Sequence, residues 1–63
     1  MDELLERLKK YHEEMGISYK IISRDINISI GVMYNYTSGI RGLKDAVRQR
    51  LNNYLKERGY WYG

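Results

Sequence analysis

The chain has 63 residues with no cysteine and no proline, and 11 basic against 8 acidic side chains give a net charge of +3. A chain this short forms one domain that buries roughly 60% of its unfolded surface, and without cysteine it can form neither disulfides nor thiolate metal sites. Its aliphatic runs are no longer than two residues, which excludes a membrane span or a signal peptide and predicts a cytoplasmic location.

The charge is unevenly distributed along the chain. Residues 1–17 carry three basic and five acidic groups, whereas residues 18–63 carry eight basic and three acidic groups. The positive field therefore belongs to the second part of the chain. Such a field favours an anionic partner such as nucleic acid, because neutralising phosphates releases counterions.

A first helix is predicted over residues 2–15. Its apolar side chains recur at steps of three and four, and they are Leu4, Leu5, Leu8, Tyr11 (or His12) and Met15. Asp2 and Glu3 lie at the end where acidic groups stabilise the helix dipole. Gly16 ends the helix.

Two short helices are predicted over residues 18–25 and 29–37. Ser18 and Ser29 are good N-cap residues, and Gly39 stops the second of these helices. Only residues 26–28 separate the two helices, and Asn27 can adopt the left-handed backbone that a sharp turn needs. This spacing is typical of a helix-turn-helix.

The helix over residues 29–37 divides into two faces. We expect Val32, Met33 and Tyr36 to point inward, and the outward set is Ser29, Ile30, Gly31, Tyr34 and Asn35. An outward isoleucine and a helix-weakening glycine favour a face that packs closely against a partner. The alternative is that Ile30 turns partly inward and Gly31 merely avoids a clash with the preceding helix.

A turn over residues 38–42 leads to a predicted helix over residues 43–58. Its buried stripe is Leu43, Val47, Leu51, Tyr54 and Leu55, and Gly59 stops it. The aromatic tail over residues 60–63 has two interpretations, a packing lid over the first helix or a dimer contact.

From Ser18 to Gly39 the chain resembles the phage repressor and Cro family of helix-turn-helix DNA-binding domains. The matching positions are Ser18 and Tyr19, Ile22 and Ser23, Ile26 and Ile28, Met33 and Tyr36, and Gly39. Ser23 stands where the family usually has alanine, and Asn27 where it usually has glycine. The resemblance implies a compact all-α, lambda repressor-like domain, with four helices here instead of the usual five.

The resemblance also implies that the helix over residues 29–37 enters the DNA major groove. Base edges would then face Ser29, Ile30, Gly31, Tyr34 and Asn35, and phosphates would contact Ser18, Tyr19, Lys20, Arg41 and Lys44, with Arg24 a weaker candidate. Asn35 can pair with adenine, and Ile30 can touch a thymine methyl group, which favours half-sites rich in A·T pairs.

The family usually binds as a dimer, and the candidate dimer surface is Tyr60, Trp61 and Tyr62. We expect a repressor or similar regulator from a bacterium, its phage or another mobile element, with no cofactor, no metal and no catalytic residue. His12 is the only histidine and has no plausible catalytic partner. The alternative function is a small protein-binding module that uses the helix over residues 29–37 or the aromatic tail.

Overall fold

The computed structural model describes residues 2–61, which form four helices and no strand. The helices are α1 (Glu3–Met15), α2 (Tyr19–Asp25), α3 (Ile30–Thr37) and α4 (Asp45–Glu57). The predicted ranges agree with these bounds to within two residues, and the all-α class is confirmed. The Cα radius of gyration is 10.5 Å, which matches the value of about 10.5 Å expected for a folded chain of this length.

Three of the four helices begin at a side-chain cap. Asp2 accepts hydrogen bonds from the backbone N–H groups of Leu4 and Leu5, and the Ser18 and Ser29 hydroxyls do the same for α2 and α3. Helix α4 begins after Lys44, which has the extended backbone of a cap but makes no capping hydrogen bond. A capping side chain accepts from backbone N–H groups of the first turn, which have no partner within the helix. Helix α4 lacks this side-chain hydrogen bond, whereas α1, α2 and α3 have it.

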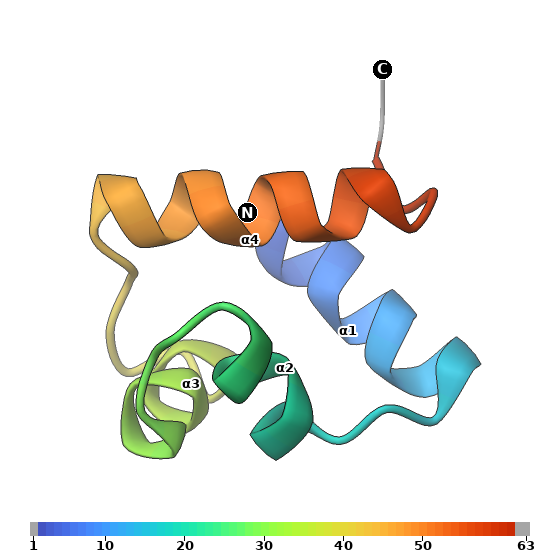
Figure 1. The fold of residues 1–63 in the computed structure, drawn as a ribbon. Coiled ribbons are helices and arrows are strands. Elements are labelled where there is room, and N and C mark those ends of the chain that lie inside the picture. The colour runs from blue at the N-terminus through green and yellow to red at the C-terminus, as the bar shows by residue number, and fades with distance from the viewer. Residues whose placement is uncertain (1, 62–63) are drawn as a thin grey trace.

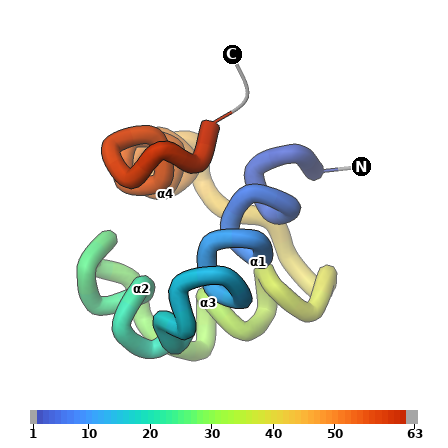
Figure 2. Tube along the Cα trace, turned by 90° about the vertical axis from the view of Figure 1, so that its right-hand side faces the viewer, coloured from blue at the N-terminus to red at the C-terminus, as the bar shows by residue number. Residues whose placement is uncertain are grey.

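The helices pack as two pairs. Helix α1 packs against α4 and reaches from beneath it to the start of α2, while α2 and α3 pack on one another at the opposite side (Figures 1 and 2). Helix α1 also contacts α3. The fully buried side chains come from all four helices, and they are Leu8, Ile22, Met33, Leu51 and Leu55.

Two residues expected in the apolar stripes are exposed instead. The expectation that Val32 points inward is wrong, because its side chain is 42% exposed. Met15 is 57% exposed because Gly16 ends α1 before the stripe reaches the core again. On α3, burial centres on Met33 and Tyr36, and Val32 lies at the edge of that face.

The turn between α2 and α3 has the conformation expected from its sequence. Asn27 is the only residue besides glycine with a positive φ in residues 2–61, at 61°. The Ile28 N–H donates to the Ser23 carbonyl at 2.9 Å, and the buried Ser23 hydroxyl donates to the Lys20 carbonyl at 2.8 Å. The buried Ser23 hydroxyl is therefore satisfied within α2.

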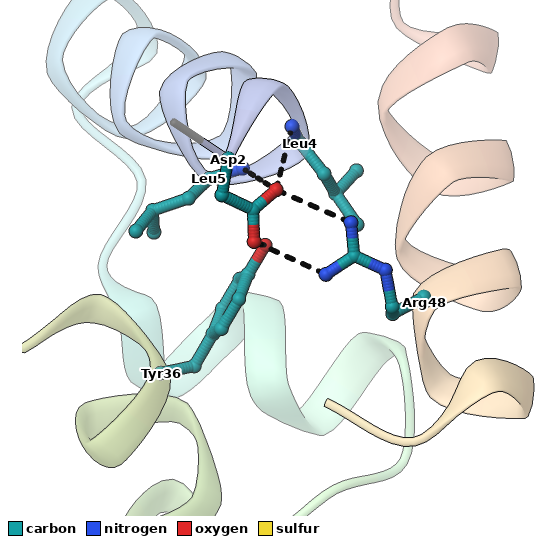
Figure 3. Close-up of polar contacts among 5 residues, drawn as sticks. All are labelled: Asp2, Leu4, Leu5, Tyr36 and Arg48. Atoms are coloured by element: carbon teal, nitrogen blue, oxygen red, sulfur yellow. Dashed lines mark hydrogen bonds and ion pairs between the residues drawn. The ribbon is translucent and has the colours of Figure 1, made fainter. Parts of the chain in front are cut away.

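One carboxylate joins three helices. Asp2, the cap of α1, accepts a hydrogen bond of 2.8 Å from the Tyr36 hydroxyl of α3. Arg48 of α4 donates to both oxygens of the same carboxylate, at 3.1 and 3.2 Å (Figure 3). Burial, and then the neighbouring Asp2, raise the pKa of the Tyr36 hydroxyl above its usual value, so this group stays a donor across ordinary pH.

The segment after α4 folds back over α1. The Tyr60 ring packs edge-on against Tyr11 at 5.2 Å between centroids, and its hydroxyl donates to Glu14 at 2.8 Å. Arg7 is only 6% exposed and donates to the Tyr60 carbonyl at 2.7 Å and to the Asn52 side chain at 2.6 Å. Tyr60 therefore packs over α1, as the first of the two interpretations of the aromatic tail predicted.

Candidate nucleic-acid interface

The outer face of α3 is centred on Gly31. Tyr34 and Asn35 flank it, the first 52% exposed and the second half-buried, while Ser29 is exposed at the start of the helix. Ile30 lies at one edge of this face, half-buried against the core. Helix α3 thus presents all five of the expected base-reading residues to solvent at least in part.

The alternative interpretation of α3 is correct for Ile30 but not for Gly31. Ile30 does turn partly inward, against the core. Gly31, however, avoids no clash with α2, because a Cβ atom there would meet only the Ser29 hydroxyl, at 3.9 Å. A glycine in open space at the middle of an exposed helical face costs helix stability without any packing reason inside the fold.

A hollow on one side of α3, here named the α3–α4 hollow, lies between α3, the following loop and α4. Its floor is apolar, and its charged lining residues are all basic: Arg41, Lys44 and Arg50. The apolar lining residues are Ile28, Val32, Leu43 and Val47. Ser29 and Asn35 complete the wall that α3 contributes.

A second hollow, the α2–α3 hollow, lies on the other side of α3. Its charged lining residues are Lys20 and Arg24, and Ile21, Ile28 and Ile30 are its aliphatic ones. Both basic side chains are exposed. Arg24 has Asp25 at 3.9 Å, at the outer limit of an ion pair, with an exposed guanidinium that water screens.

The two hollows beside α3 differ in charge from three other hollows on the surface. Each of those three contains at least one carboxylate: Glu14 in one, Glu3 in another, and Asp25 and Glu57 in the third, which Arg50 also lines. Within residues 2–61, five basic and no acidic side chains line the two hollows beside α3. The exposed face of α3 is therefore bordered on both sides by positive charge.

Of the five expected phosphate-contacting residues, Lys20, Arg41 and Lys44 are exposed and line the two hollows beside α3. The exposed Ser18 caps α2 and lines neither hollow. Tyr19 is half-buried and stacks on His12, with ring centroids 4.0 Å apart. Burial, and then the charge of Glu13, raise the pKa of the Tyr19 hydroxyl, which therefore remains protonated and able to donate.

Arg50 also lines the α3–α4 hollow but was not among the phosphate-contacting residues expected from the sequence. Lys44, Val47 and Arg50 follow one another at three-residue spacing and line the same hollow. Residues three apart share one side of a helix. This spacing is the sequence signal that would have placed Arg50 beside Lys44.

The three candidate dimer residues have different surroundings. Tyr60 is half-buried against α1, as described above, whereas Trp61 is 51% exposed with the Lys56 ammonium 5.3 Å from its ring centroid. Tyr62 lies outside the described residues. Among the described residues after α4, Trp61 is thus the exposed large apolar side chain.

His12 has a structural role at the start of α2. Its Nδ1 atom lies 2.5 Å from the Ile17 carbonyl oxygen, and its ring supports Tyr19. Within residues 2–61, no group of three or more His, Cys, Asp or Glu side chains could hold a metal ion. None of the helices in that range has both the length and the apolar composition needed to cross a membrane.

Comparison of the chain with protein-family models, curated proteins and solved structures finds no significant match.

Proposed function

We propose that this chain binds double-stranded DNA with α3 in the major groove and acts as a transcriptional regulator, most simply a repressor. The observation that carries the proposal is the purely basic lining of the two hollows beside α3. Phosphate neutralisation supplies most of the affinity of such proteins. The resemblance of Ser18–Gly39 to the phage repressor and Cro family supports the same mode.

The dimensions of α3 suit this role. An α-helix with its side chains is about 10–12 Å in diameter, and the major groove, about 12 Å wide, admits one. The base-facing set is Ser29, Ile30, Gly31, Tyr34 and Asn35, and the phosphate-facing set is Ser18, Tyr19, Lys20, Arg24, Arg41, Lys44 and Arg50. Phosphate contacts on both sides of α3 would fix its position, and the base contacts would select the site.

Specific binding would come from a homodimer on two half-sites about 34 Å apart. The half-exposed Trp61 is the residue on which we base this dimer, with the aromatic tail around it. Trp61→Ala is expected to shift the protein toward monomer in sedimentation experiments and to weaken DNA binding. Unchanged oligomeric state and unchanged affinity would contradict this dimer mode.

A protein-binding module is the second candidate function. Helix α3 contains no charged residue, and it exposes Val32 and Tyr34 to solvent. An uncharged face with exposed aliphatic and aromatic groups also suits a protein partner. A protein partner does not need the surrounding positive field, so the DNA-binding function has the greater support. Bacterial cytoplasm, in a host or its mobile elements, is the location that DNA binding implies.

The test compares two charge-removing double variants by fluorescence anisotropy. One removes Lys44 and Arg50 beside α3, and the control removes the exposed pair Lys9 and Lys10 of α1; all four become alanine. Binding to an A·T-rich duplex is measured at several salt concentrations. We expect the first variant to reduce the slope of log K against log salt by about two, since each phosphate contact contributes about 0.9.

The control pair should leave the slope unchanged. Equal effects of the two double variants would show that only net charge matters, and would contradict an interface at α3. Absence of binding at low salt would favour the protein-binding module.

A further inference from the structure

One row of side chains on α3 faces the more basic of the two hollows. Ser29, Val32 and Asn35 stand at three-residue spacing, and all three line the α3–α4 hollow together with Arg41, Lys44 and Arg50. Residues three apart are neighbours on a helix surface. Val32 and Asn35 therefore present an isopropyl group and an amide side by side, next to the Ser29 hydroxyl that caps the helix.

We infer that this row reads A·T base pairs, with Asn35 on the adenine and Val32 against the C5-methyl group of a thymine. The inference rests on the proposed DNA-binding function and specifies its substrate. Adenine offers N7 as acceptor and N6 as donor, which one side-chain amide can satisfy together. Thymine is the standard base with a methyl group in the major groove.

The sequence favoured Ile30 for the contact with a thymine methyl group, and the structure favours Val32 instead. Ile30 is half-buried against the core, whereas Val32 is 42% exposed beside a hollow bordered by three basic side chains. Phosphates held by those side chains would bring the edges of the bases toward Val32. The part of Val32 that stays exposed gains burial when it packs against a methyl group.

The composition of α3 supports the same preference. The helix IGVMYNYT has no arginine or lysine, the side chains that most often read guanine. Gly31, next to Val32, presents no side chain that would hold the helix away from the groove floor. Direct reading by this helix is thus limited to amide, hydroxyl and apolar contacts.

The experiment uses the full chain and a duplex obtained by selection from a random-sequence pool. Each thymine of the selected duplex is replaced in turn by deoxyuridine, which removes the methyl group and keeps the base pairing. We expect at least one replacement to weaken binding about fourfold, the factor that burial of one methyl group provides.

Val32→Ala should bind the thymine and deoxyuridine duplexes equally, because the partner of the methyl group is gone. Alanine is a better helix former than valine at this exposed position, so the variant is expected to fold, which circular dichroism checks. Met15→Ala, at another exposed apolar residue on α1, is the matched control and should keep the preference for thymine. Asn35→Ala should keep that preference but lose discrimination at the adenine.

Two results would overturn the inference and leave DNA binding intact. One is a selected site in which no single thymine replacement weakens binding. The other is a preference for thymine that survives Val32→Ala. Failure to select any duplex with salt-sensitive binding would overturn the proposed function, and the inference with it.

Discussion

The Tyr36 hydroxyl donates a 2.8 Å hydrogen bond to the carboxylate of Asp2, and this bond ties the exposed helix α3 to the cap of α1. Arg48 holds the same carboxylate from α4 (Figure 3). The Asp2 carboxylate therefore helps to hold α3, and with it the proposed DNA-binding face, against α1 and α4.

Asp2→Asn is expected to reduce the free energy of unfolding by about 1 kcal/mol. Asparagine caps a helix as well as aspartate does, so the change isolates the charge that Arg48 and Tyr36 contact. Hydrogen bonds to charged groups are stronger than those between neutral groups, but the side chains of Asp2 and Arg48 are both partly exposed to water. Urea denaturation measures the effect, with the exposed Glu3→Gln as the control. Equal loss in both variants would show that the contacts of Asp2 contribute nothing specific.

The contribution of Asp2 should disappear in acid. Hydrogen bonding to Arg48 lowers the pKa of the Asp2 carboxyl from 3.8 to about 2, against the opposing effect of partial burial and with help from Tyr36. Because the folded-state pKa is the lower one, the stabilisation is complete above the unfolded value and is lost as pH falls from 3.8 toward 2. The difference in unfolding free energy between the wild type and Asp2→Asn should shrink over that range. A difference that stays constant from pH 7 to pH 2 would contradict it.

Gly31→Ala should separate stability from binding. The added methyl group has room, and alanine is favoured over glycine within a helix by about 1 kcal/mol, so the melting temperature should rise by roughly 4–8 °C. The same methyl group would stand at the centre of the proposed DNA-binding face and should weaken binding. Asn53→Ala, exposed on α4, is a control that raises helix propensity away from α3. Unchanged DNA affinity in Gly31→Ala would argue against close approach of the α3 backbone.

Lys44→Ser should have a similar double effect at α4. Lys44 has φ −65° and ψ 154°, close to the −71° and 154° of the serine that caps α3. A serine there can cap the helix and stabilise the fold by about 1 kcal/mol, while DNA binding loses a phosphate contact. Lys44→Ala should lose the same binding without the added stability. If both variants bind DNA as the wild type does, Lys44 is no phosphate contact.

Local signals in the sequence were sufficient for most of the fold. Ser18 and Ser29 mark helix starts because their side chains accept from the first free N–H groups, and both caps are present. Asp2, expected only to stabilise the helix dipole, caps α1 as well. Asn27 adopts the left-handed turn that its short polar side chain tolerates. These features depend on neighbours within a few residues, which a single sequence displays directly.

Features that depend on contacts between distant residues were less accessible. The side of α3 that faces inward is set by its packing on α2 and α1, and a helix of eight residues has too few turns for periodicity to fix that direction. Val32 was misplaced for this reason. The burial of Arg7 depends on partners 45 and 53 residues away, Asn52 and Tyr60, so no local pattern in the sequence indicates it.

The hydrogen bond from the Arg7 side chain to the Tyr60 carbonyl affects how the domain unfolds. It joins α1 to the segment after α4, and the contacts of Asp2 join α1 and α4 to α3. Opening either end of the chain therefore removes support from the pair α2 and α3. Hydrogen exchange in α3 should then require unfolding of the whole domain, so that the proposed DNA-binding helix is no looser than the core beneath it.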